Sequence, residues 1–352
     1  MPKLAPPPPV APETWRALLD DASAFAAAKP WKYMYDSDVV GLIDPITGET
    51  RIGTVLGNAG EVFAAVFYRR PDGLRWIFGM LDIASADLEN FNIADGMDVL
   101  KLEFVPKREL WKEDLAALKT AAFQPAGKGS VWPQFRSAEP GWHPWHISQS
   151  EAEQFLADLP RLTAFCKLFE ENPALFDGRG QMDIPFLPAT LPNRPLTPDD
   201  LDWRPLLSPP AAGCEPFQIS TDHLGQLRAL KRQPGLACEF DCLLIPGGSF
   251  IESGRPCFGR FGLLVEKRRG LVIGMSMQSG GCTPGDAAGR GLVESLLKAG
   301  HLPEKIFISG PRLQPALQPL CDELQIELQP SSSLPVLEEA IYSMSQHMMG
   351  AM

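Results

Sequence analysis

ACEFDCLLIPGGSFIESGRPCFGRFGLLVEKRRGLVIGMSMQ, residues 237–278, is the stretch that decides the fold of the C-terminal half. It holds three apolar runs, at 237–245, 260–266 and 270–278, rich in the branched and aromatic side chains that favour β-strands. The last two runs are joined by Lys-Arg-Arg-Gly at 267–270, a short polar connection that indicates a hairpin. We therefore expect three strands in antiparallel succession.

Helices and strands alternate after this stretch. Thr283 and Pro284 are a typical helix start, with a threonine at the N-cap and a proline at the first helical position. Gly300 is the residue expected just beyond the end of that helix. The order that follows predicts an α/β domain with a mixed sheet. Its further elements are a strand at 305–309, a helix at 310–324, a strand at 325–328 and a helix at 334–348.

This order of elements resembles the ribonuclease H-like fold over residues 235–348. Enzymes of that fold hold two metal ions between carboxylates, so the resemblance implies a metal-dependent nuclease or phosphotransfer enzyme. The fourth strand ends in Ser309 and Gly310 without an acid, which leaves the carboxylate set incomplete. The candidate ligands in the remaining places are Asp241 or Glu239, Glu294, and Glu338 or Glu339.

The N-terminal half has a different pattern. A helix at 13–28 precedes several strands, and further helices follow them, which predicts an α+β domain over residues 13–176. Residues 1–12 are proline-rich, and we expect a disordered leader there. Residues 177–212 carry eight prolines with little periodicity, which indicates a linker to an α/β domain at 213–352.

Three motifs give the whole chain a second resemblance. They are DPITGE at 44–49, VWPQFRSAEPGWHPW at 131–145 and LPVLEEA at 334–340. With these motifs the chain is similar to an uncharacterised group of bacterial two-domain proteins whose domains have no assigned function. That resemblance implies no particular chemistry.

Charge and cysteine content narrow the class of protein. The net charge of −11 disfavours binding to duplex nucleic acid, which depends on basic side chains at the phosphates. No apolar run approaches the roughly 20 residues that cross a membrane. The seven cysteines include no Cys-x-x-Cys pair, so we expect reduced thiols, a cytoplasmic location and no zinc site.

Tryptophans and histidines crowd into residues 130–148. The prolines there exclude regular structure, so the rings either hold down a corner of the domain or form a ligand or partner surface. Two histidines without a third ligand are weak grounds for a metal. Ser148 and Glu151 then form a capping box that begins a helix. The tentative ligand-binding residues are Trp132, Arg136, Trp142, His143, Trp145 and His146.

One cluster of cations stands out in an acidic chain. The turn at 267–270 could combine with arginines of the preceding loop and strand into one positive patch for a phosphate or an acidic partner. The alternative is a solvated hairpin tip whose charges protect a sheet edge. The residues concerned are Arg255, Arg260, Lys267, Arg268 and Arg269.

These observations favour a cytoplasmic, non-catalytic two-domain protein that acts through a protein or small-ligand surface. No cofactor is predicted, because the glycine-rich stretch at 278–291 contains neither a Walker A loop nor a Gly-x-Gly-x-x-Gly motif. The metal-dependent enzyme remains the alternative, and the spacing of its carboxylates decides between the two.

Overall fold

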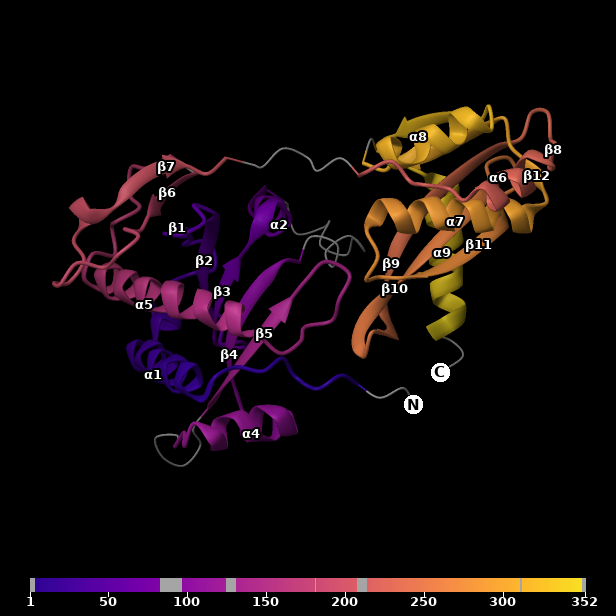
Figure 1. Cartoon of the computed structure of the whole chain (residues 1–352). Coiled ribbons are helices and arrows are strands. Elements are labelled where there is room, and N and C mark those ends of the chain that lie inside the picture. Colours follow the sequence, from indigo (N-terminus) through magenta and orange to yellow (C-terminus); the bar gives the residue numbers. More distant parts are fainter. Residues whose placement is uncertain are drawn as a thin grey trace.

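The chain folds around two separate sheets, each with its own core (Figure 1). The structure is a computed structural model and describes residues 4–82, 97–124, 131–180, 182–207, 214–310 and 312–349. The expectation of an α+β domain followed by an α/β domain with a mixed sheet is confirmed at this level. Within the described ranges, no helix is both long and apolar enough to cross a membrane.

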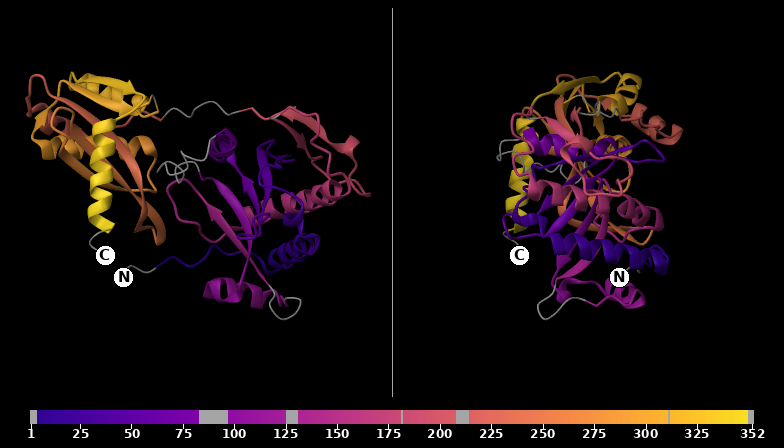
Figure 2. Two further views of the ribbon diagram at one scale, coloured as in Figure 1. Left: turned by 180° about the vertical axis from the view of Figure 1, so that it is seen from behind. Right: turned by 90° about the vertical axis from the view of Figure 1, so that its left-hand side faces the viewer.

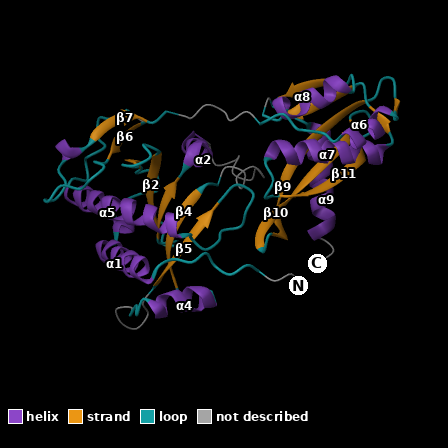
Figure 3. Ribbon diagram, in the orientation of Figure 1, coloured by secondary structure: helices purple, strands orange, loops and turns teal. Residues whose placement is uncertain are grey.

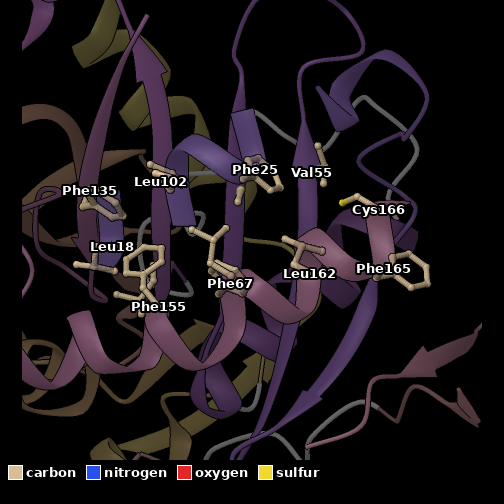
Figure 4. Close-up of a cluster of buried hydrophobic side chains, with 14 of the residues drawn as sticks. Leu18, Phe25, Val55, Phe67, Leu102, Phe135, Phe155, Leu162, Phe165 and Cys166 are labelled. Atoms are coloured by element: carbon tan, nitrogen blue, oxygen red, sulfur yellow. The ribbon is translucent and has the colours of Figure 1, made fainter. Parts of the chain in front are cut away.

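The first sheet has seven strands in the order β5-β4-β3-β2-β1-β6-β7, and its first five strands pair in antiparallel fashion. The helices α1 and α5 pack their apolar stripes on one face and form the main core, where side chains such as Leu18, Phe67 and Phe155 meet (Figure 4). Helix α2 packs on the other face through Ile77. The elements are α1 Pro12–Ala28, η1 Pro30–Lys32, β1 Val40–Ile43, β2 Thr50–Leu56, β3 Ala64–Tyr68, α2 Arg70–Asp82, β4 Val99–Val105, η2 Lys107–Glu109, α4 Lys112–Thr120, β5 Trp132–Ala138 and α5 Gln149–Glu171.

The segment expected to be a linker contributes two strands to this sheet. β6 (Asp183–Phe186) pairs in parallel with β1, and β7 (Asp202–Pro205) pairs with β6, with η3 (Pro198–Asp200) between them. Gly41 makes the approach possible, because a Cβ there would lie 2.5 Å from the Phe186 ring. Proline is tolerated in such short strands at the margin of a sheet. The linker is therefore shorter than 177–212, and residues 208–212 lie outside the described residues.

The proline-rich leader, where it is described, is ordered against the rest of the chain. Residues 4–11 run in extended form from α1 to the second domain (Figure 1). The amide of Ala5 donates to the carbonyl of Gly254 at 2.7 Å, and the amide of Ala11 donates to Oε1 of Gln149 at 2.9 Å. One hydrogen bond to each domain therefore holds the leader, so the predicted disorder is not found over residues 4–11. Residues 1–3 lie outside the described residues.

The second sheet has five strands in the order β11-β10-β9-β13-β14. The first three form the expected antiparallel succession, and β13 and β14 run parallel to β9. β9 and β10 are longer than the sequence predicted, because they continue into a hairpin arm, residues 246–258, whose tip is at Ser253 and Gly254. The strands are β9 Ala237–Glu252, β10 Arg255–Glu266, β11 Leu271–Ser279, β13 Lys305–Ser309 and β14 Glu327–Ser331, and the short β8 Lys231–Arg232 pairs with β12 His301–Leu302.

Helices cover both faces of this sheet (Figure 3). α6, α7 and α8 pack on one face. α9 packs on the other, and seen from behind it lies in front of the strands (Figure 2). Thr283 caps α7 through its side chain and Gly300 ends it in the left-handed conformation, as predicted. The helices are α6 Thr221–Arg228, α7 Pro284–Ala299, α8 Gln314–Glu323 and α9 Pro335–Met349.

Candidate ligand site at the domain junction

The tryptophan- and histidine-rich loop between β5 and α5 is where the two domains meet. Phe258 donates its amide to the carbonyl of Gly141 at 3.0 Å, and His143 donates its amide to the carbonyl of Pro256 at 3.2 Å. The His143 ring lies 4.0 Å from the Phe258 ring. Gly141 has φ of +80°, and a Cβ there would lie 1.8 Å from the carbonyl oxygen of Gly280, so only glycine allows this approach. The loop thus docks the hairpin arm onto the first domain.

A cleft of 540 Å³ lies beside this junction. The leader, the β5–α5 loop, the beginnings of α2 and α5, and the hairpin arm all contribute to its wall. Clefts between domains are common places for small ligands. The lining residues are Ala5, Pro6, Pro8, Arg69, Arg70, Ser137, Glu139, Trp142, Trp145, His146, Ser148, Ser150, Glu151, Gln154, Ser253 and Arg255.

Arg255 of the hairpin arm has the least satisfied charge in this wall. Its Nη1 lies 3.3 Å from a carboxylate oxygen of Glu139, and its guanidinium carbon lies 5.0 Å from the centre of the Trp142 ring. Its Nε and Nη2 atoms are buried and have no hydrogen-bond partner. Because a buried donor without an acceptor costs free energy, these two groups are the natural contacts for a bound acceptor.

Two further arginines of the wall precede and begin α2. Arg69 is buried, and it donates to Asp98 at 3.1 Å, to Glu151 at 2.8 Å and to Ser137 at 3.2 Å. The Arg70 side chain is half exposed and is held by the carboxylate of Asp98. The side chains of α2 and α5 that line the cleft lie at helix N-termini, where the backbone amides favour negative charge.

Glu151 anchors this wall from the first turn of α5. It completes the predicted capping box, since its carboxylate accepts the amide of Ser148 at 2.8 Å while the Ser148 hydroxyl accepts the amide of Glu151. Burial raises the pKa of Glu151, but the bonds from Ser137, Ser148 and Arg69 outweigh the burial, so its pKa lies below the usual value. Glu151 is therefore ionised and neutralises Arg69.

His146 lines the cleft, but most of its contacts belong to a neighbouring cluster. Arg136 forms a two-pronged ion pair with Asp114, at 2.8 and 2.6 Å, and lies 4.1 Å from the centre of the Trp111 ring. The Nδ1 atom of His146 lies 3.6 Å from the same carboxylate. Burial, and then the charge of Arg136, lower the pKa of His146, while Asp114 opposes the shift. The imidazole is accordingly neutral near pH 7.

The structure brings together some of the predicted ligand-binding residues and separates others. Trp142, Trp145 and His146 line the cleft, and Trp145 is almost completely buried. Trp132 and Arg136 lie on strand β5, so the prediction that prolines exclude regular structure from this stretch is wrong for residues 132–138. Arg136 forms its ion pair with Asp114, and Trp132 packs between Phe123 and Lys107. Neither of these two lines the cleft. His143 serves the junction, and its Nε2 is buried without a partner.

Arg69 and Arg70 were not singled out from the sequence, although a signal was present. The stretch Tyr-Arg-Arg-Pro-Asp at 68–72 passes from a strand into a helix whose second residue is proline. Two arginines at such a strand-to-helix step place cations at a helix N-terminus, which is a common anion-binding arrangement. The contribution of the leader had no local signal, because it depends on a contact with Gly254.

The predicted basic patch is divided along β10. Arg255 begins the strand and Lys267 follows its end; the strand is 12 residues long, about 40 Å at the usual rise per residue. Arg260, between them, is buried. Lys267 lies 3.4 Å from Glu239 and 3.9 Å from the centre of the Phe307 ring, and Arg269 lies 3.8 Å from Glu266. Only Arg255 of these cations reaches the cleft.

The carboxylates implied by the ribonuclease H-like resemblance lie on different faces of the second sheet. Phe240 and Cys242 point to the α7 side, so the alternation of β9 turns Asp241 toward the α9 side, whereas Glu294 belongs to α7. Glu239 accepts the amides of Val336 and Leu337 at 3.0 and 2.9 Å. Of the two candidates on α9, Glu338 and Glu339, the first accepts the amide of Leu334 at 3.2 Å. Among the described residues, no group of three His, Cys, Asp or Glu side chains is placed to hold a metal ion.

Comparison with known proteins assigns a family description to each domain. A model of a domain of unknown function, DUF7309, matches residues 15–184, and a second, DUF6930, matches residues 223–345. The prediction of a two-domain chain of uncharacterised families is thereby confirmed. No curated protein and no solved structure matches the chain.

Proposed function

We propose that this protein binds a small anionic ligand, bearing a phosphate or carboxylate group, in the cleft between its DUF7309 and DUF6930 domains. The observation that carries the proposal is the Arg255 guanidinium, which has two buried donors without acceptors in the wall of that cleft. Arginine donors in a fixed planar arrangement match the oxygens of a phosphate or a carboxylate.

The charges of the wall support an anion over a cation. Three arginines and two glutamates line the cleft. Glu151 is already engaged by Arg69, Ser137 and Ser148, and Glu139 by a single contact to Arg255. The N-termini of α2 and α5 add partial positive charge. Asp98 balances part of the charge of Arg69 and Arg70, so the attraction for an anion depends mainly on the free donors of Arg255 and on the two helix N-termini.

Each domain supplies one of those arginines, so an anion between them would link the two domains. Arg70 belongs to the first domain and Arg255 to the arm of the second. The rings of Trp142 and Trp145 supply apolar wall beside the charges, which suits a ligand with an organic part. The leader crosses the same cleft through Pro6 and Pro8 and limits access to it.

A ribonuclease H-like fold for the second domain belongs to the same proposal. It is supported by the strand order β11-β10-β9-β13-β14, in which three antiparallel strands are followed by two strands parallel to the first. A metal-dependent nuclease is less well supported, since Asp241 and Glu294 lie on opposite faces of the sheet. A cytoplasmic location is supported by the seven cysteines, all of them free thiols.

A thermal-shift screen tests the proposal. All eight tryptophans lie between Trp15 and Trp203, so their fluorescence follows the unfolding of the first domain. Inorganic phosphate, pyrophosphate, citrate and adenine nucleotides are compared at constant ionic strength. A ligand at about 100 times its dissociation constant adds about 2.7 kcal/mol of stability, and we expect one anion class to raise Tm by several degrees.

Arg255→Gln should abolish that response. The matched control is Arg269→Gln, which removes an exposed arginine from the far end of β10 and should respond as the parent chain does. An unchanged Tm with every anion, or an equal response in Arg255→Gln and the parent chain, contradicts the proposal.

A further inference from the structure

The cleft at the domain junction holds an unsatisfied acceptor as well as unsatisfied donors. Gln154 lines the cleft from the second turn of α5. Its Oε1 atom is buried without a hydrogen-bond partner, and the same is true of Nε and Nη2 of Arg255. Because buried polar groups in folded proteins are nearly always hydrogen-bonded, an acceptor and two donors left open in one cleft indicate a ligand that carries groups of both kinds.

The surroundings of Gln154 favour a positively charged donor. Gln154 follows Glu151 by three residues on α5, so the two side chains are neighbours on one face of the helix. Glu151 is ionised, because its pKa lies below the usual value. A donor that reaches the Gln154 oxygen therefore approaches a carboxylate, which stabilises an ammonium group more than a hydroxyl or an amide.

Charges of the two signs are balanced around the cleft. Three arginines and two glutamates line it, and one aspartate is buried against two of the arginines. The cations are Arg69, Arg70 and Arg255, and the anions are Glu139, Glu151 and Asp98. A ligand with only negative charge would leave this site unbalanced, whereas a ligand that carries one charge of each sign would leave it neutral.

We propose that the ligand of this cleft is a small zwitterion, whose carboxylate or phosphate is bound by Arg255 and whose ammonium group donates to Oε1 of Gln154. The inference rests on the proposed function, because it places the anionic group at Arg255. It adds a contact in the other domain, since Arg255 belongs to the hairpin arm and Gln154 to α5. A zwitterion satisfies the open groups of both side chains, whereas a simple anion satisfies only those of Arg255.

The ammonium group should make a measurable difference to affinity. A site that hydrogen-bonds one group of its ligand rejects the analogue that lacks this group, because the buried protein partner is then left unpaired. Hydrogen bonds to charged groups are stronger than those between neutral groups. Removal of the ammonium group alone should therefore weaken binding by about tenfold.

Isothermal titration calorimetry with matched pairs of compounds, at constant ionic strength and neutral pH, tests the inference. Phosphoethanolamine is compared with ethyl phosphate, which lacks only the amino group. Glycine, β-alanine, γ-aminobutyrate and ε-aminocaproate are compared with acetate, propionate, butyrate and caproate, so that the spacing between the two charges varies. We expect the zwitterion of at least one pair to bind about tenfold more tightly than its partner.

Variants of Gln154 test the second contact. Gln154→Leu removes the acceptor and should bind the two members of that pair with equal affinity. Gln154→Glu offers only acceptors and carries a negative charge, so it should preserve or increase the preference for the zwitterion. The matched control is Gln226→Leu, which changes an exposed glutamine of α6 outside the cleft and should behave as the parent chain does.

The outcomes distinguish this inference from the proposed function. Simple anions that bind through Arg255 as tightly as their zwitterionic partners leave the anion site intact and overturn the inference. A preference for the zwitterion that persists in Gln154→Leu, or that is lost in Gln154→Glu, also overturns it. If no compound of any pair binds, the anion site itself is refuted and the inference is refuted with it.

Discussion

Arg51 and Arg255 have opposite surroundings. Arg51 belongs to a region that stabilises the fold, whereas Arg255 belongs to the cleft that we propose as a ligand site. Arg51 is 2% exposed, and its Nε and Nη1 reach Asp158 and Asp44 at 2.5 and 2.9 Å. Arg255 has one ion pair at 3.3 Å, and two of its nitrogens have no acceptor. Burial opposes the charge of Arg51, but its hydrogen bonds to Asp158 and Asp44 outweigh the burial, so its pKa lies above the usual value.

The network around Arg51 is complete. Asp158 also pairs with Arg161 at 3.3 Å, and Arg161 donates to the carbonyls of Ile43, Leu187 and Pro188. Arg161 thereby links the segment that follows β6 to helix α5. A network with every donor satisfied stabilises one structure, whereas unsatisfied donors in a cleft can still gain a partner. The predictions below separate these two roles.

The largest effect is expected at Asp158. Asp158→Ala leaves two buried guanidinium groups without their shared carboxylate, and loss of one partner of a buried pair costs about 4 kcal/mol. Urea unfolding followed by tryptophan fluorescence measures it. Glu109→Ala, which removes an exposed pair with Arg108, is the control and should leave the midpoint nearly unchanged. A similar small shift in both variants would mean that the network does not stabilise the domain.

Trp145 and Trp142 should differ in the property that they affect. Trp145→Ala removes a 7% exposed ring from the first domain, and we expect a loss of about 3 kcal/mol in its unfolding free energy. Trp142 is half-buried and contacts the second domain at two places. The Arg255 guanidinium of the hairpin arm lies 5.0 Å from the centre of its ring, and a Cβ on Gly281, between β11 and α7, would collide with the ring. Trp142→Ala should therefore leave the unfolding of the first domain nearly unchanged and weaken the anion response. Equal destabilisation by the two variants would contradict this division.

Removal of the leader should open the cleft. Deletion of residues 2–9 removes Pro6 and Pro8 from its wall, so iodide should quench tryptophan fluorescence more strongly. The increase should be reduced when Trp142→Phe is combined with the deletion. Gly254→Val, whose side chain would displace Ala5, should reproduce part of the increase. Unchanged quenching in the deletion variant would mean that the leader does not cover the cleft.

The smallest effect concerns pH. The pKa of His146 is lowered in the folded chain by burial and Arg136, while Asp114 and Glu113 act in the opposite direction. The unfolded chain therefore binds the proton first as the pH falls below about 6.5, and this contribution to stability is lost as the pH falls from there to the folded pKa. His146→Gln should give a flatter dependence of unfolding free energy on pH in that window. An identical slope in the parent chain would show that His146 is not shifted.

Local patterns predicted the elements whose causes are local. The Thr283 cap, the Ser148–Glu151 capping box and the strands on either side of residues 267–270 depend on neighbours in the sequence, and all are present. The strand β6 and the docked leader depend on contacts with Gly41 and Gly254, far away in the chain. Proline content alone could therefore not distinguish a linker from a strand at the margin of a sheet. It could also not distinguish a disordered leader from one that is bound to both domains.

The candidate site shows the same division. Three rings of the predicted stretch line the cleft because they share one loop. Arg136 was grouped with them by its position in the sequence, but Asp114 on α4 holds it in another cluster. Arg255 was assigned to a basic patch, and the fold carries it instead to the cleft. Convergence of this kind requires the tertiary structure, because no spacing within the sequence encodes it.

The central claim is that Arg255 has donors free for a ligand, whereas Arg51 and Arg161 do not. Its most direct test is a phosphate titration followed by NMR at the Nε–H signals of the arginine side chains. Arg255→Gln identifies the Arg255 signal by its absence. The account predicts that inorganic phosphate, with citrate as a second probe, shifts the Arg255 signal saturably and leaves those of Arg51 and Arg161 unchanged. An Arg255 signal that does not move with either anion, or equal movement of all three signals, would contradict it.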